Sequence, residues 1–377
     1  MNKDLYDLCI SVKENCNETD DYFANIKLLL NELGVEDKYI FNEIINQYTE
    51  LVDYNNNIKY QYNHVFKENK LLQKAIKRNF NRVCTQPTQV QRTPEWFEAR
   101  RNRVTASEIS ALFTTKAKWN ELLKKKCVDT NNSFFGGDAI LHGKKFETIV
   151  QYEYMIERET NILEFGCLIH RDYSFIGASP DGIDEKDYTM IEIKCPTSRK
   201  IRNLPTFDYW CQMQLQMEVA NLNKCIFIES KIIVYENKQD FLDDTVDKGN
   251  SLFTKENKKK GAVIVVFKEG QEEDYIYPDI DIIKLRNQEN LLTWVKDESN
   301  KLYNDITVLS FRVDYYYIEG TYEIMIYRNR SWFYDKLEII KQFWNEVLES
   351  RENKRFENEI KKVKKQKPCL FDKCLFD

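Results

Sequence analysis

One short stretch of the chain has the residue types of a metal-dependent phosphodiesterase site. Asp181 lies in a Pro-Asp-Gly turn, and Glu192 and Lys194 follow a short way downstream, alternating with two isoleucines. In a strand this alternation places the carboxylate and the ammonium on one face and the isoleucines on the other. If turn and strand lie side by side, Asp181 and Glu192 converge as hard oxygen ligands suited to Mg²⁺ or Mn²⁺. The same pattern also fits an ordinary turn before a solvated strand, so the surrounding elements must decide.

Two helices are expected to bring further polar groups to these strands. An amphipathic pattern beginning near Leu141 predicts a long helix in which Glu147 falls close to the buried side. A carboxylate there needs a partner or a metal, because burying it unpaired is costly. A second helix, predicted from Tyr209 to Val219, carries Gln212 near its start, and this amide can point to the metal site. The methionines of that helix are expected in the core.

The residues before the site are of types that can bind phosphate. Thr93 followed by proline predicts the start of a helix that leads to Arg100. Thr105 or Ser107 is expected to cap a second helix, whose backbone N–H groups could meet the Arg100 guanidinium at a phosphate. Simple capping explains the same residues. The segment from Lys67 to Arg103 contains ten basic residues and only three acidic ones, a charge balance that suits contact with phosphates. A solvated helix face explains the lysines before residue 85 equally well.

Strand patterns connect these groups. We expect an antiparallel meander with Asp181 and Glu192 on adjacent strands. The predicted strands cover Glu164–Ile169, Tyr173–Ser179 and Thr189–Cys195, with a further strand at Cys225–Glu229.

Composition limits the class of protein. With 377 residues, 42% of them hydrophobic, the chain can bury a large core. It has no apolar run of about 18 residues and no signal-peptide pattern, so we expect a soluble, intracellular protein with no membrane span. The ten cysteines form no C-x-x-C pair, which indicates reduced, mostly structural thiols. With only three histidines, the chain also has few ligands for a zinc site. The net charge of −5 does not by itself indicate a nucleic-acid binder.

The ordered set of motifs resembles the YqaJ-like viral recombinase family, which includes the alkaline exonuclease of phage lambda and belongs to the PD-(D/E)XK nucleases. The motifs are Trp96-x-x-x-Arg100, Thr105-Ala106-Ser107, Gly143 to Glu147, Ser179-Pro180-Asp181-Gly182, Glu192-Ile193-Lys194-Cys195-Pro196 and Tyr209 to Gln214. The resemblance implies an α/β (α+β) fold with a restriction-endonuclease-like core, in which a mixed central sheet is flanked by helices.

The resemblance also implies a domain organisation. Residues 89–230 and 311–351 would form the nuclease core, with 231–310 as a mixed insertion. Residues 1–88 would be a helical N-terminal accessory region, joined through a linker at Thr85–Gln89, and 352–377 a basic, flexible tail. That tail repeats Cys-Leu-Phe-Asp, which would suit a docking peptide or an unstructured end.

Site roles are carried over on the matching positions. By resemblance, Asp181, Glu192 and the backbone carbonyl of Ile193 hold the catalytic Mg²⁺, with Mn²⁺ as a substitute, and Lys194 positions or deprotonates the attacking water. Glu147 would be the helix carboxylate that hydrogen-bonds a metal water or binds a second ion. The remaining implied roles are orientation of the site by Gln212 and binding of a terminal 5′-phosphate by Arg100 and Ser107.

The implied activity is that of a Mg-dependent deoxyribonuclease. It would be a 5′–3′ exonuclease on linear double-stranded DNA in viral recombination, repair or replication. Two alternatives stay open, a structure-specific or nicking endonuclease of the same superfamily and a non-catalytic DNA-end binding or assembly factor. The implied partners are DNA ends and a single-strand annealing protein. The ring of the phage relative implies a homotrimer, while the extra segments leave a monomer open. If the source is a large DNA virus, the protein would act in the host cytoplasm or a virus factory.

Overall fold

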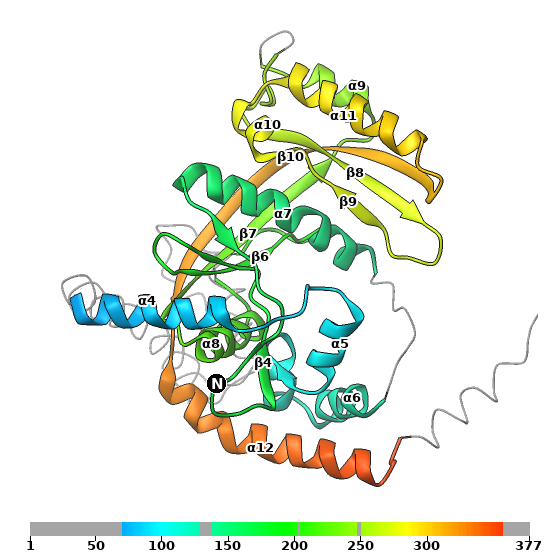
Figure 1. The fold of residues 1–377 in the computed structure, drawn as a ribbon. Helices are drawn as coiled ribbons and strands as arrows, with labels where there is room; N and C mark the ends of the chain where they lie inside the picture. The colour runs from blue at the N-terminus through cyan, green and yellow to red at the C-terminus, as the bar shows by residue number, and fades with distance from the viewer. Residues whose placement is uncertain (1–69, 129–136, 203, 247–249, 357–377) are drawn as a thin grey trace, which may run out of the picture.

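The computed structural model describes residues 70–128, 137–202, 204–246 and 250–356. It confirms a mixed α/β fold in which sheets are flanked by helices (Figure 1). Strands β6 and β7 of the larger sheet are parallel and its other neighbours are antiparallel, so the sheet is mixed as predicted. In spatial order its strands are β2 (Ile162–Leu163), β5 (Gly182–Asp184), β6 (Met190–Lys194), β7 (Lys224–Val234), β10 (Val308–Tyr327), β8 (Lys260–Lys268) and β9 (Asp274–Ile276).

The chain changes sheets just before Asp181, so the predicted single meander is wrong. Strand β4 (Ile176–Ala178) belongs to a smaller sheet with β1 (Val104–Thr105) and β3 (Leu168–Ile169), whereas β5 belongs to the larger one. Proline has no N–H to donate to a strand ladder, and Pro180 stands at the change. Asp181 therefore lies in the turn that enters β5 and not on a strand. Because Gly182 of β5 pairs with Ile191, the turn still lies beside β6.

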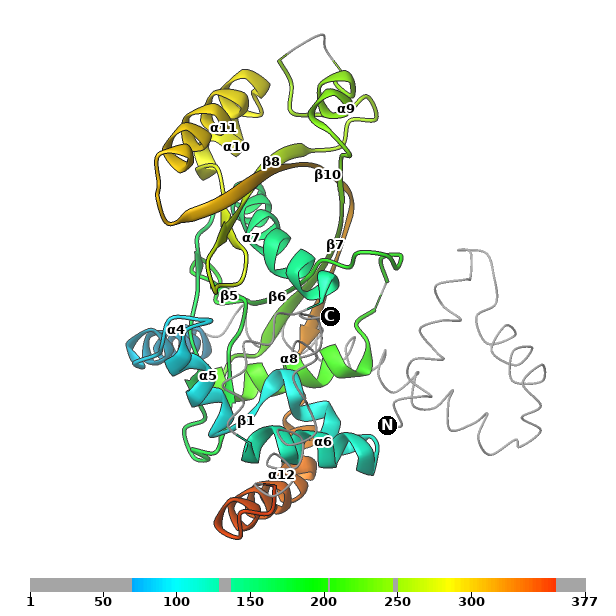
Figure 2. The same ribbon diagram turned by 90° about the vertical axis from the view of Figure 1, so that its right-hand side faces the viewer.

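Two long helices cover opposite faces of β6 and β7 (Figure 2). Helix α7 (Asp138–Arg158) packs on the isoleucines of β6, and α8 (Phe207–Ala220) packs on the side that bears Met190. The predicted alternation in β6 is confirmed, as is the burial of the α8 methionines. The face with Glu192 is nevertheless covered by α8 and is not open to solvent, since Glu192 is fully buried.

Further helices pack around α8 and the smaller sheet. They are α4 (Lys70–Thr85), α5 (Pro94–Arg101), the 3₁₀ helix η2 (Ala106–Phe113), α6 (Lys116–Cys127) and α12 (Arg330–Glu352). Thr93 caps α5 as predicted, accepting a hydrogen bond from the N–H of Trp96 at 3.3 Å. Thr105 precedes η2 but makes no side-chain cap, because its hydroxyl donates to the Glu108 carboxylate at 2.5 Å.

The expected linker at Thr85–Gln89 lies against the core. The Gln86 side chain donates to the carbonyl of Ile169 at 3.1 Å and accepts from its N–H at 3.2 Å, so this segment extends the edge at β3. Predicted features before residue 70, and the duplicated Cys-Leu-Phe-Asp, fall outside the described residues.

Strands β7 and β10 extend beyond the core into the segment between them, which we name the distal lobe (residues 235–307). Strand β10 pairs with β7 from Tyr316 to Tyr327 and with β8 from Val308 to Tyr317, and its register shifts between Ile318 and Gly320. The lobe also contains α9 (Lys238–Asp243), α10 (Ile280–Leu285) and α11 (Gln288–Tyr303). Arg286 adopts a left-handed conformation and separates α10 from α11. The division of the chain into domains stays a prediction.

A buried ion pair ties α8 to the end of β10. The Glu218 carboxylate accepts from Nε of Arg328 at 2.9 Å and lies 3.6 Å from Nε2 of His170. Burial alone would raise the pKa of Glu218, but the nearby His170 ring and the Arg328 charge outweigh it and hold this pKa below its usual range.

Candidate active site

Asp181 is fixed to β6 by a backbone hydrogen bond. Its Oδ2 accepts from the N–H of Ile193 at 2.7 Å, which places the carboxylate beside the residue after Glu192. On the other side, the Gln151 side chain of α7 donates to the Asp181 carbonyl at 2.8 Å. The turn is therefore held from both the strand and the helix, and the first two predicted metal ligands lie together.

Glu192 is a fully buried carboxylate surrounded by donors. Gln212 donates to Oε1 at 2.7 Å, and Gln216 donates to Oε2 at 2.8 Å. Lys194 forms an ion pair with Oε1. The predicted approach of Gln212 is thus observed. Gln216 was not selected from the sequence, although it lies one helical turn after Gln212 and therefore on the same side of α8.

The cationic and acidic groups of the site shift one another's ionisation. Burial alone would lower the pKa of Lys194, but the charges of Glu192 and Asp181 outweigh it and raise this pKa. Burial raises the pKa of Asp181, and the charges of Glu192 and Glu147 add to the rise. Burial also raises the pKa of Glu147, although the nearby Arg92 opposes it. Three carboxylates thus lie close enough to affect one another's ionisation, and of these Glu192 is fully buried.

Glu147 extends from α7 and faces Arg92, at 3.8 Å between Oε2 and Nη2. Sequence reasoning assigned no partner to it, because Arg92 comes from a loop before α5. Across the described residues, no group of three or more His, Cys, Asp or Glu side chains is arranged to hold a metal ion. The candidate donor set is therefore two carboxylates, Asp181 and Glu192, with the Ile193 carbonyl. These are hard oxygens in a region with excess negative charge, which fits a hard divalent cation.

The two predicted phosphate-binding residues are in direct contact. The Arg100 guanidinium donates from Nη2 to the Ser107 hydroxyl at 2.7 Å and lies 4.4 Å from the centre of the Trp96 ring. Trp96 donates from Nε1 to the Ser179 hydroxyl at 3.1 Å. The Ser179 carbonyl in turn accepts from Gln216 at 3.4 Å. The Arg100–Ser107 pair is therefore connected to the carboxylates through Trp96 and Ser179.

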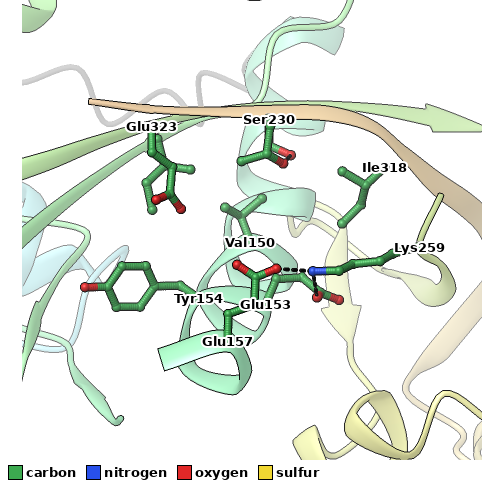
Figure 3. A pocket seen from close by; sticks show the side chains of 10 residues that line it. Val150, Glu153, Tyr154, Glu157, Ser230, Lys259, Ile318 and Glu323 are labelled. Atoms are coloured by element: carbon green, nitrogen blue, oxygen red, sulfur yellow. Dashed lines mark hydrogen bonds and ion pairs between the residues drawn. The ribbon is translucent and has the colours of Figure 1, made fainter. Parts of the chain in front are cut away.

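A separate cavity of about 240 Å³ lies between α7 and strands β7 and β10 (Figure 3). It contains none of the predicted site residues. Lys259 lies between Glu153 and Glu157 inside it, and Glu323 pairs with Arg158. Because its acidic side chains already have cationic partners, we assign no ligand to this cavity.

Residues 95–223 match the model of the YqaJ-like viral recombinase domain. An uncharacterized protein of Acanthamoeba polyphaga mimivirus is 28% identical over 311 residues, which are 74% of this chain and 56% of that protein. The chain thus spans about half the length of this curated relative. No helix in the described parts of the chain is long and apolar enough to cross a membrane.

Solved structures give weaker likenesses. The alkaline exonuclease LHK-Exo of Laribacter hongkongensis is 19% identical, with a TM-score of 0.40 over 72% of this chain and 100% of that chain. Its complex with dAMP gives the same values. A phage-related exonuclease of Haemophilus somnus is 14% identical, with a TM-score of 0.33 over 69% of this chain and 96% of that chain.

The mixed fold and the carboxylate site thus accompany a match of residues 95–223 to the YqaJ-like viral recombinase domain. This match agrees with the resemblance that the motifs of the segment predicted.

Proposed function

We propose that the protein is a metal-dependent deoxyribonuclease that degrades linear double-stranded DNA from a 5′-phosphorylated end, in recombination, repair or replication of a viral genome. The observation that carries the proposal is the connection between the two groups of the site. Trp96 and Ser179 join the Arg100–Ser107 pair to the turn that carries Asp181. A terminal phosphate held by the pair would place nearby phosphodiester bonds within reach of the carboxylates.

Asp181, Glu192 and the Ile193 carbonyl would hold Mg²⁺, with Mn²⁺ as a substitute. Such a cation neutralises charge on phosphoryl oxygens and lowers the pKa of the water molecule that it binds, which makes that water a better nucleophile. The protein's own groups orient the site. The Ile193 N–H fixes the Asp181 carboxylate, and two glutamines fix that of Glu192. Lys194 supplies a positive charge beside Glu192, where it can position the attacking water or the scissile phosphate.

Arg100 and Ser107 supply the groups that distinguish a phosphorylated end. A guanidinium gives planar, charge-assisted donors to a phosphate, and a serine hydroxyl adds a donor at short range. A 5′-hydroxyl end would leave this pair without its ligand. We therefore expect 5′-phosphorylated ends to be preferred, with DNA ends as the primary partner and a single-strand annealing protein as a further one.

The test follows digestion of linear duplex DNA with 5′-phosphate or 5′-hydroxyl ends, beside a covalently closed circle, with and without Mg²⁺. Wild type is compared with Lys194→Ala and Arg100→Ala, and Lys231→Ala serves as a control because its ion pair with Glu319 lies at the bulge of β10, on residues that take no part in the proposed site. We expect Lys194→Ala to reduce digestion by about 10²- to 10⁴-fold and Arg100→Ala to act mainly on phosphorylated ends.

Each other result has a definite meaning. Cutting of the circle would replace the exonuclease by an endonuclease of the same superfamily. Tight DNA binding without digestion in Mg²⁺ or Mn²⁺ would indicate a non-catalytic end-binding factor.

A further inference from the structure

A buried lysine behind the proposed phosphate pair has no role in the function proposed so far. Lys126 of α6 is only 2% exposed. Its ammonium donates to the backbone carbonyl of Arg100 at 2.9 Å and to Oε2 of Glu108 at 2.6 Å. These acceptors belong to two different segments, the end of α5 and the helix η2 that contains Ser107. One side chain thus joins the two segments that carry the pair.

Glu108 explains why a cation is needed at this point. It follows Ser107 directly, so its charge would repel a phosphate bound there. The carboxylate is balanced by Lys126 and by Lys125, whose Nζ lies 2.8 Å from Oε1, and it accepts from the Thr105 hydroxyl at 2.5 Å. Burial alone would raise the pKa of Glu108, but the charges of Lys126 and Lys125 outweigh it and hold this pKa well below its usual range. Glu108 is therefore an anion whose charge is locally compensated.

The last helix holds the other side of this arrangement. Arg351 of α12 donates from Nη2 to the carbonyl of Lys126 at 2.7 Å and to that of Arg101 at 2.9 Å. Its Nη1 donates to the Asn102 side chain at 3.0 Å. The end of α5 and the end of α6 are thus fastened to each other from outside as well as through Lys126.

We propose that Lys126 is a positioning residue for recognition of the 5′-phosphate, an inference that rests on the proposed function of Arg100 and Ser107. Lys126 sets the separation of α5 and η2 and neutralises Glu108, so that Arg100 and Ser107 face a phosphate with their donors aligned and no uncompensated anion behind them. Lys126 does not touch the phosphate, because it is buried.

The test compares Lys126→Met with Lys260→Met. Lys260 is an equally buried lysine, 2% exposed, whose ammonium donates to the carbonyls of Phe241 and Asp244 and to the Thr245 hydroxyl in the distal lobe. Both variants lose a buried ammonium and its hydrogen bonds, so both should lower the melting temperature. The deciding readout is the ratio of kcat/KM on 5′-phosphate ends to that on 5′-hydroxyl ends.

We expect Lys126→Met to lower this ratio by about tenfold, the effect of one charge-assisted hydrogen bond, and Lys260→Met to leave it unchanged. An equal loss on both kinds of end in Lys126→Met, with the ratio retained, would overturn the inference while leaving the proposed function intact. If wild type itself shows no preference for phosphorylated ends, the proposed role of Arg100 and Ser107 fails, and the inference fails with it.

Glu108→Gln provides a second variant in case Lys126→Met does not fold. It keeps the size of the side chain and removes the negative charge that Lys126 compensates, while the ammonium keeps its hydrogen bond to the Arg100 carbonyl. Because no anion then lies behind the pair, a ratio equal to or above that of wild type is expected. A clear fall of the ratio in a folded Glu108→Gln protein would contradict the inference.

Discussion

Gln216 offers the sharpest test of how the catalytic carboxylate is held. It is fully buried on α8, and its Nε2 donates to Oε2 of Glu192 at 2.8 Å and to the Ser179 carbonyl at 3.4 Å. Both Gln212 and Lys194 reach the other oxygen, Oε1. Among the described residues, Gln216 is thus the donor that holds Oε2. Gln216→Leu keeps an uncharged side chain of similar size and removes this donor.

The expected magnitude follows from the charge of the acceptor. A hydrogen bond to a charged group contributes about 1.5–3 kcal/mol, and a buried group left without its partner bears the desolvation penalty. If that loss is expressed in the transition state, kcat/KM falls by roughly tenfold to a hundredfold, since about 1.4 kcal/mol corresponds to a factor of ten. The carboxylate is expected to turn towards its remaining donors and to leave the orientation that suits the cation.

Gln214 supplies a matched control on the same helix. It is also buried, but it donates to the Tyr327 carbonyl at 3.0 Å and accepts from the Asn329 N–H at 2.6 Å. Neither partner belongs to the proposed site. Gln214→Leu should lower the melting temperature at least as much as Gln216→Leu does and leave kcat/KM on linear duplex DNA within about twofold of wild type. Equal losses of kcat/KM in the two variants, or full activity in Gln216→Leu, would refute the reasoning.

Three further predictions concern the cation, one ion pair and one close contact. Mg²⁺ at about ten times its dissociation constant should stabilise wild type by about 1.4 kcal/mol in thermal unfolding, and Asp181→Asn should abolish that gain; a gain of the same size in the variant would place the cation elsewhere. Glu218→Gln should cost about 3–5 kcal/mol in chemical unfolding at neutral pH, because it leaves Arg328 buried without its anion. Since the pKa of Glu218 is held below its usual range, its stabilisation is present at neutral pH and lost as the pH falls through the folded-state pKa, so the gap between wild type and variant should close in acid. Gly166→Ala should destabilise the fold by about 1–3 kcal/mol, because a Cβ there would lie 1.9 Å from the carbonyl oxygen of Gln89. An unchanged melting temperature would contradict this, because it would mean that the backbone at Gln89 can move away at no cost.

What the sequence predicted well depended on short-range periodicity. The alternation in β6 and the helical spacing of α8 placed Glu192, Lys194 and Gln212 correctly relative to one another, because strand and helix periods fix which side chains share a face. Arg100 and Ser107, which the resemblance paired, are in direct contact. Their chemical roles remain predictions.

What it missed depended on contacts between distant segments. Gln151 reaches the Asp181 carbonyl across thirty positions of the chain, and no local pattern marks it. Lys126 is the last of three consecutive lysines, and nothing in that run distinguishes the buried one from its exposed neighbours. The change of sheet at Pro180 was missed because two short strands in different sheets have the same alternating pattern as two strands in one.

The length of β10 has a consequence for how this protein can vary. Residues Tyr316 and Tyr317 pair with β7 on one side and with β8 on the other, so one strand is shared by the core and the distal lobe. Just beyond them, the register shift before Gly320 bends the strand as a bulge does, and the curve is visible in Figure 2. Adding or removing one residue at this bend would turn every later side chain to the opposite face. The bend is therefore a fixed feature of β10. The number of residues in it sets the direction in which the distal lobe extends from the core that carries the carboxylates.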